Sequence, residues 1–310
     1  KKVFLKSREE IDPTSEQSKD VLDLYNQGFL NEALEKLKPL VEKNPGSAYL
    51  LNIQGITFAG LKQIELAIDC YKRALKIKPN YAEVYSNIGN AMRDNGDLNL
   101  AIVNCKEAIK IKPDFATAYY NLGNAFYDLE DYDRAIDNFN IAIKTKPDFV
   151  EAYLNKCTAL NGKGDYAEAL QNCIQVLKLK PDYTKVYFSL VVALRGFNAR
   201  GMGFKKWDPN LSFHILNMLE ETTCVRPKDI EPVVGKLLKL APAVKKLFEF
   251  HSKGTLVDNV IDIVAELAKL PLLLKLMSIC PLSDPKFEIV FTDLREALIL
   301  SISEISSSEE

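Results

Sequence analysis

Apolar residues in the first half of the chain form short stripes with helical spacing, and polar turns separate the stripes. In residues 82–115 the first stripe consists of Tyr85, Ile88 and Met92. After an Asn-Gly-Asp turn, a second stripe follows, made of Ala101, Cys105, Ala108 and Ile109. Spacings of three and four residues place side chains on one face of a helix, and an Asn-Gly-Asp run is typical of a turn. The pattern therefore predicts two helices joined by a short turn.

This helix pair recurs every 34 residues. The period is marked by Pro45, Pro79, Pro113, Pro147 and Pro181, and by Ala33, Ala67, Ala101, Ala135 and Ala169. A fixed period of this length indicates a solenoid, in which each repeat packs only on its neighbours. We predict an all-α chain with a polar lead-in at residues 1–13, a first helix capped by Thr14 or Ser15, and a capping helix at residues 184–195. The five predicted repeats are residues 14–47, 48–81, 82–115, 116–149 and 150–183.

Two of the repeats resemble a known family most clearly. They read VYSNIGNAMRDNGDLNLAIVNCKEAIKIKPDF from Val84 and AYYNLGNAFYDLEDYDRAIDNFNIAIKTKPDF from Ala118. These residues are similar to the tetratricopeptide repeat, and the resemblance covers a little over half of the chain. It implies a right-handed superhelix whose first helices line a concave binding face. The departures are local: Val21 and Cys157 replace the small glycine of the first helix, and Leu37, Cys105 and Cys173 replace the aromatic residue of the second.

The periodic pattern fails at Gly196, and a different organisation follows. Residues 196–210 hold three glycines and the chain's one Trp, so we predict a linker loop there. This loop is either functional or a connector held by Phe197, Phe204 and Trp207. We expect residues 211–303 to form a compact helical domain without repeats, and residues 304–310 to be a polar, disordered tail. The helices expected in this domain are residues 211–221, 227–240, 242–253, 256–270, 272–280 and 285–303.

The second half also has a weaker resemblance of its own. RPKDIEPVVGKLLK from Arg226 and LPLLLKLMSICPLSDPKFEIVFTDLREALI from Leu270 resemble a helical segment found between tetratricopeptide repeats and a methyltransferase-like domain in large bacterial proteins. The resemblance implies that the chain is the front part of a longer protein. No Gly-x-Gly-x-x-Gly signature occurs, so the catalytic part would be absent. The lack of an initiator Met agrees with a fragment.

Composition narrows the function further. The net charge of −2 gives no electrostatic footprint for nucleic acid, and no apolar run is long enough to span a membrane. The six cysteines form no Cys-x-x-Cys motif, so we expect reduced, buried thiols and a cytoplasmic protein. We interpret the two histidines, His214 and His251, as ordinary helix residues, because neither belongs to a metal-binding motif. We expect no catalytic residue, metal or cofactor.

The candidate binding residues are asparagines at fixed positions of the first helices. Counted from the start of each repeat, position six is Asn87, Asn121 and Asn155, and position nine adds Asn90 and Asn124. This arrangement resembles the asparagine ladder of O-linked N-acetylglucosamine transferase repeats, which implies contacts to the backbone of an extended peptide. We expect Tyr120, Tyr127, Asp94 and Asp128 to lie nearby and to favour a basic or polar ligand. Repeat two has Ile53 at position six and the capping helix has Ser189, so the ladder is expected to be short.

A second interpretation of these asparagines stays open, in which they are consensus residues that bond neighbouring helices or water. The carboxylate clamp of chaperone-binding tetratricopeptide domains is not met, because Ser86, Tyr120 and Leu154 stand where its first Lys would be. We therefore predict a non-catalytic interaction module for an extended protein segment. Two alternatives are the substrate-recruiting part of a larger methyltransferase or glycosyltransferase, and a self-assembling scaffold that forms a homo-oligomer.

Overall fold

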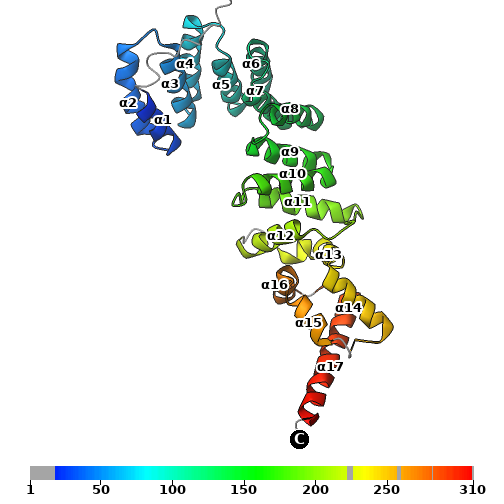
Figure 1. Ribbon diagram of the computed structural model, residues 1–310. Helices are drawn as coiled ribbons and strands as arrows, with labels where there is room; N and C mark the ends of the chain where they lie inside the picture. The colour runs from blue at the N-terminus through cyan, green and yellow to red at the C-terminus, as the bar shows by residue number, and fades with distance from the viewer. Residues whose placement is uncertain (1–17, 222–225, 257–259, 281, 309–310) are drawn as a thin grey trace, which may run out of the picture. The chain divides into compact units, whose positions relative to one another are not determined.

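The computed structural model describes residues 18–221, 226–256, 260–280 and 282–308, and all its regular elements in these ranges are α-helices (Figure 1). Packing divides the chain into two compact units, Lys1–Asn155 and Lys156–Glu310, which we call unit 1 and unit 2. The division falls inside helix α9, Val150–Lys163, and not in the predicted linker at residues 196–210. The predicted all-α solenoid is confirmed. The lead-in and the Thr14 or Ser15 cap lie outside the described residues.

Unit 1 consists of consecutive helix pairs that follow the 34-residue period. Its helices are α1 Lys19–Asn26, α2 Leu30–Lys43, α3 Ala48–Gly60, α4 Ile64–Ile77, α5 Ala82–Asp94, α6 Leu98–Ile111, α7 Ala116–Asp128, α8 Tyr132–Thr145 and the start of α9. Helices α1, α3, α5 and α7 each pack on the second helix of their own repeat, and α2, α4 and α6 each pack on the first helix of the next repeat. The alanines that mark the period, Ala33, Ala67, Ala101 and Ala135, have no exposed surface. Their small side chains allow the helices to approach closely.

In repeats two, three and four, a second close contact joins a glycine of the first helix to a buried side chain 16 positions later. A Cβ atom added at Gly55 would lie 2.3 Å from Cε1 of Tyr71, and one at Gly123 would lie 2.7 Å from Cε1 of Phe139. Both aromatic side chains are fully buried. In repeat three the partner of Gly89 is Cys105, whose Sγ would lie 2.5 Å from the added atom. In these three repeats, packing therefore leaves room only for glycine at this position.

Unit 2 begins with one and a half helix pairs that keep the 34-residue period, and the period is lost after them. Its helices after α9 are α10 Tyr166–Leu179, α11 Val186–Ala199, α12 Pro209–Glu221, α13 Pro227–Leu238, α14 Pro242–Lys253, α15 Val260–Leu267, α16 Pro271–Ile279 and α17 Pro285–Ser308. Five of these helices begin at a proline, which suits the first turn because the missing N–H has no partner there anyway. Buried aliphatic residues such as Val234, Leu247 and Leu276 form the core of this part.

Two predicted boundaries are wrong. The linker was expected to begin at Gly196, but α11 runs through this residue to Ala199. The reason is packing: a Cβ at Gly196 would lie 2.3 Å from the ring of Tyr166, so this glycine lets a helix approach and does not end one. The connection is residues 200–208, and the Phe197 and Phe204 rings stack across it with centroids 5.1 Å apart. The predicted disordered tail is also wrong up to Ser308, where α17 ends.

Candidate functional site

The predicted asparagines lie on one side of the first helices, and we call this side of α3, α5, α7 and the start of α9 the first-helix face. Asn87 Nδ2 donates to Asn52 Oδ1 at 2.8 Å. Asn121 Nδ2 donates to Ser86 Oγ at 3.0 Å, and Asn155 Nδ2 donates to the Tyr120 hydroxyl oxygen at 3.0 Å. All three bonds span 35 residues, from position six of one repeat to position five of the repeat before it. The asparagines therefore join successive repeats.

Burial differs along this row of hydrogen bonds, which we call the amide seam. Asn121 and Asn124 are buried, with 8% and 6% of their surfaces exposed. Asn155 Nδ2 also donates to Asn124 Oδ1 at 2.7 Å, so the two amide side chains are joined by a hydrogen bond. Asn87, Asn90 and Asn155 are half-buried. The interpretation that the asparagines bond neighbouring helices is thus observed, and contact with a peptide stays a prediction.

The predicted acidic residues belong to a chain of ion pairs at the ends of the first helices. Asp94 lies 3.6 Å from Lys62 Nζ and 3.1 Å from Arg93 Nη2. Arg93 Nε also lies 3.4 Å from Asp128 Oδ2 on the next repeat. Two basic groups thus balance the two carboxylates, which reduces the negative potential that would attract a basic ligand.

The two predicted tyrosines are held by neighbouring rings. Tyr120 lies against Phe149, with ring centroids 4.9 Å apart, and its hydroxyl receives the Asn155 bond. The ring centroids of Tyr127 and Tyr132 lie 5.8 Å apart. Burial raises the pKa of the Tyr127 hydroxyl. Sequence reasoning missed Asn52, Ser86 and Arg93 as partners. Position five of repeats two, three and four holds a residue that can accept a hydrogen bond, namely Asn52, Ser86 and Tyr120, and this recurrence was the available signal.

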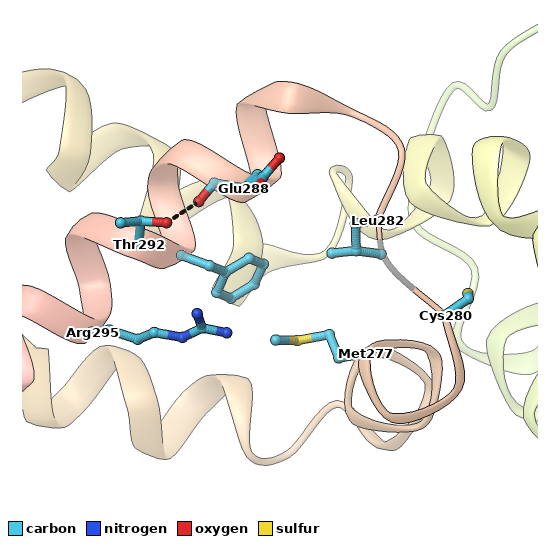
Figure 2. Close-up of a pocket in the computed structure, with 7 residues that line it drawn as sticks. Met277, Cys280, Leu282, Glu288, Thr292 and Arg295 are labelled. Atoms are coloured by element: carbon cyan, nitrogen blue, oxygen red, sulfur yellow. Dashed lines mark hydrogen bonds between the residues drawn. The ribbon is translucent and has the colours of Figure 1, made fainter.

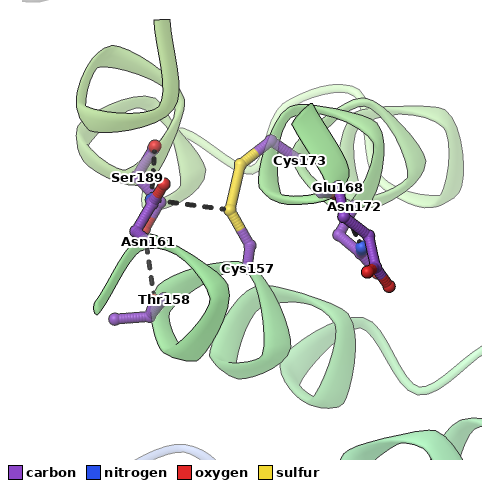
Figure 3. Close-up of a disulfide and its surroundings, with 7 residues drawn as sticks. All are labelled: Cys157, Thr158, Asn161, Glu168, Asn172, Cys173 and Ser189. Atoms are coloured by element: carbon purple, nitrogen blue, oxygen red, sulfur yellow. Dashed lines mark hydrogen bonds between the residues drawn. A yellow bond between two sulfur atoms is a disulfide. The ribbon is translucent and has the colours of Figure 1, made fainter. Parts of the chain in front are cut away.

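The cysteines differ from the prediction. Cys157 and Cys173 form a disulfide between α9 and α10, with Cα atoms 6.1 Å apart (Figure 3). The expectation of six reduced thiols is therefore wrong for these two residues. Cys157 occupies the glycine position of its repeat and Cys173 the aromatic position, so the close contact of the helix pair brings the two sulfur atoms together. Cys157 and Cys173 are 16 residues apart, so no motif of closely spaced cysteines contains them both.

A pocket of about 240 Å³ lies in unit 2, where side chains of α16 and α17 meet those of the segment between them (Figure 2). Its described lining is Met277, Cys280, Leu282, Glu288, Phe291, Thr292 and Arg295. The Thr292 hydroxyl donates to the Glu288 carbonyl oxygen at 2.8 Å, so it serves its own helix. No sequence pattern indicated this pocket, because it forms only where side chains of two neighbouring helices and the segment between them come together.

The two histidines take part in the packing of unit 2. Nε2 of His251 lies 2.6 Å from Oδ2 of Asp293, which joins α14 to α17. His214 is buried, and this burial lowers the pKa of its imidazole. Among the described residues no group of three or more His, Cys, Asp or Glu side chains is placed to hold a metal ion. Within the same described ranges, no helix has both the length and the apolar character needed to cross a membrane.

Helix pairs with a 34-residue register define a helical-repeat protein, and comparison with known families identifies the repeat. A model described as TPR repeat matches residues 55–96 and 89–129, and models described as tetratricopeptide repeat match residues 116–149 and 150–183. Residues 55–183 of the chain are thus tetratricopeptide repeats, and such repeats indicate a protein–protein interaction module.

Individual proteins show the same repeat. The probable UDP-N-acetylglucosamine–peptide N-acetylglucosaminyltransferase SEC of Arabidopsis thaliana is 32% identical over 74 residues, which are 24% of this chain and 8% of the plant protein. The structure of TTC0263, a thermophilic TPR protein of Thermus thermophilus, has a TM-score of 0.52 at 20% identity, covering 58% of this chain and 97% of that chain. PilF of Pseudomonas aeruginosa has a TM-score of 0.54 at 16% identity, covering 70% of this chain and 96% of that one. The two structures share the fold.

Proposed function

We propose that the first-helix face binds an extended segment of a partner protein through its asparagine side chains. The observation that carries this proposal is the constant register of Asn87, Asn121 and Asn155. The amide seam uses the nitrogen of each side chain as a donor. Their carbonyl oxygens accept no hydrogen bond from a described residue, and none of these oxygens is buried. An amide held by its nitrogen presents a fixed acceptor to a ligand.

The spacing of the repeats suits a peptide backbone. Packed helices lie about 8–10 Å apart, and an extended chain advances about 3.3 Å per residue. One acceptor per repeat could then meet a peptide N–H about every third residue. Each such bond contributes about 0.5–1.5 kcal/mol, and it does not depend on the peptide side chain. Modest affinity with loose sequence preference follows.

Charge has a small part in this proposal. Asp94 and Asp128 are balanced by Lys62 and Arg93, so the face offers few uncompensated charges. A neutral, polar segment fits it better than a strongly basic one. We expect the affinity to change little with salt, since only uncompensated surface charges are sensitive to screening.

Unit 2 offers a different kind of contact at position five, the position before the one that holds the asparagines. Phe188 on α11 stands 68 residues after Tyr120, which is two repeats, and its side chain is 74% exposed. An exposed aromatic side chain on a helix of this kind is a candidate anchor for an apolar side chain of a partner. We propose that unit 2 binds through Phe188, whereas unit 1 binds through amides.

The test uses peptides selected from a random 16-residue display library on the purified chain. Affinities of the selected peptides and of scrambled versions are then measured by fluorescence anisotropy. Asn90→Ala is the informative variant, because Asn90 lies on the first-helix face and takes no part in the amide seam. Loss of one bond should weaken binding by about 2–13-fold. Phe188→Ser tests the contact proposed for unit 2, and it should also weaken peptide binding.

Two matched variants serve as controls. Asn104→Ala removes an amide that bonds the Leu100 carbonyl of its own helix, α6, and Phe213→Ser removes another exposed phenylalanine, on α12. Both should bind like the parent chain. Equal affinity of Asn90→Ala and the parent, together with weaker binding by Asn104→Ala, would place the ligand on the second helices and reject the proposal.

A second candidate function is the recruitment of substrate for an attached enzyme. The observation that favours it is the match of 74 residues to the plant N-acetylglucosaminyltransferase, of which this chain spans only 8%. A reading frame that continues into a catalytic domain would support this function. The binding proposal for the first-helix face is the same in both cases.

A further inference from the structure

The Cys157–Cys173 disulfide occupies a position at which the earlier repeats use a packing contact. Gly55 with Tyr71 and Gly123 with Phe139 show the same separation of 16 residues between the two helices of a repeat. In repeat five both residues are cysteines, and both have no exposed surface. In repeat five, a covalent bond that can be made and broken thus replaces the packing contact found in repeats two and four.

The surroundings of the disulfide connect it to a third helix (Figure 3). Asn161 Nδ2 lies 3.9 Å from Cys157 Sγ and donates to the Ser189 carbonyl oxygen on α11 at 2.9 Å. The Thr158 and Ser189 hydroxyls lie 3.2 Å apart. Helix α9 therefore contacts α10 through the disulfide and α11 through the next turn. A change at the sulfur atoms reaches both neighbours.

The remaining described cysteines are poorly suited to exchange with this pair. Cys70 and Cys105 are buried, and burial raises the pKa of their thiols to about 11 and about 12. Burial also raises the pKa of the Cys280 thiol. The thiolate is the form that attacks a disulfide, so these three residues rarely compete. Among the cysteines that the structure describes, oxidation and reduction are thereby confined to one pair.

We propose that Cys157 and Cys173 form a reversible dithiol–disulfide site that controls how readily helices α9, α10 and α11 separate. Reduction requires a dithiol reductant, such as a thioredoxin-class protein or dithiothreitol. One reductant thiolate attacks a sulfur atom of the pair and forms a mixed disulfide, releasing the other cysteine as a thiolate. The second reductant thiol then displaces the first cysteine. Two electrons and two protons pass to the pair, and the reductant leaves as its own disulfide.

Because both sulfur atoms are buried, the reductant reaches them only when the helices open. The crosslink in turn restricts the opened chain, and closing a loop of about 15 residues corresponds to roughly a hundredfold change in an opening equilibrium. The disulfide and the opening of repeat five thus control each other. Neither the family matches nor the binding proposal assigns such a role to this pair.

The experiment compares the full chain after equilibration with oxidised glutathione and after reduction with dithiothreitol. Unfolding in alkylating reagent followed by mass spectrometry should label four of the six cysteines in the oxidised chain and all six in the reduced chain. Hydrogen–deuterium exchange should then rise at least about tenfold in residues 156–199 on reduction. Helices α5 and α7 provide the internal reference, and their exchange should stay unchanged.

Two variants make the result specific. Cys173→Ala should show the same exchange in both conditions, whereas Cys105→Ala should respond like the parent chain. Labelling of all six cysteines after the glutathione treatment would overturn the proposal, and so would equal exchange of the oxidised and reduced parent. If a variant fails to fold, the comparison of the oxidised parent chain with the reduced parent chain still tests the proposal.

Discussion

Unit 1 makes the same kinds of contact in several successive repeats, whereas helices α13–α17 of unit 2 make each contact once. In unit 1 the amide seam returns with a fixed separation of 35 residues. In unit 2, Lys239 pairs with Asp284 over 45 residues, His251 with Asp293 over 42, and Ser283 with Glu231 over 52. Repeated contacts extend a structure from neighbour to neighbour, as expected for a solenoid. Single contacts instead bring together segments that no shared register relates.

The largest expected effect is on stability, and it tests whether the close contact of the glycine stabilises a repeat. Gly123→Val should lower the free energy of unfolding by about 2–3 kcal/mol, because the new side chain overlaps the buried Phe139 ring. Denaturant unfolding followed by circular dichroism measures this. Gly46→Val is the control, since a Cβ there meets no atom within 4 Å, and it should change stability by less than about 0.5 kcal/mol.

A double variant sharpens this prediction. Phe139→Ala added to Gly123→Val should recover part of the loss, because the space of the ring becomes free for the valine. If Gly123→Val and Gly46→Val unfold at the same denaturant concentration, the glycine contact does not distinguish the repeats from ordinary helix pairs.

A smaller effect is expected from the amide seam. Asn121→Ala removes the hydrogen bond to the Ser86 hydroxyl in a buried setting and should cost about 1–2 kcal/mol. Asn138→Ala is the matched control, because its exposed amide bonds only the Arg134 carbonyl of its own helix, and its effect should be near zero. Hydrogen exchange of α5 and α7 would show whether the loss is local to the two repeats. Equal stability of the two variants would mean that the seam contributes nothing to the fold.

The smallest expected effect concerns a single contact of unit 2. The Lys239 ammonium group beside Asp284 lowers the pKa of that carboxyl group. The pair therefore stabilises the fold above the ordinary aspartate pKa of about 3.9, and this contribution is lost as pH falls through the lower pKa of the folded state. Because the Asp284 side chain is 36% exposed, we expect less than about 1 kcal/mol.

This pH dependence can be measured with Lys239→Met. The parent should be more stable than the variant in urea at pH 7, and the difference should shrink towards pH 2. Lys245→Met, which removes an exposed lysine of α14, should show no such change. A difference between the parent and Lys239→Met that stays constant over this range would show that the ion pair is not its cause.

The sequence predicted the features that repeat or that depend on local chemistry. The period indicated the helix pairs of unit 1, and prolines such as Pro242 and Pro285 marked helix starts in unit 2. Asn87, Asn121 and Asn155 make one kind of hydrogen bond in a constant register, while their contact with a peptide stays a prediction. Their hydrogen-bond partners were missed, because the register between repeats is 35 residues and becomes visible only when position five is compared with position six.

Other features depend on tertiary contacts that the local pattern does not contain. Gly196 was interpreted as a turn residue, although its small size serves the contact with Tyr166 inside α11. The disulfide was missed since Cys157 and Cys173 each look ordinary in their own helix and meet only through the helix pair. The pocket in unit 2 has the same origin, because its lining residues come from separate helices.

The fixed register of the amide seam has a consequence for how such a chain can change in length. Removing residues 82–115 would bring the repeat of Asn121 directly after the repeat of Asn52. The amide of Asn121 would then face the same acceptor that Asn87 uses now. Whole repeats are thus interchangeable at this seam, and a gene could gain or lose 34 codons there without leaving a buried donor unpaired.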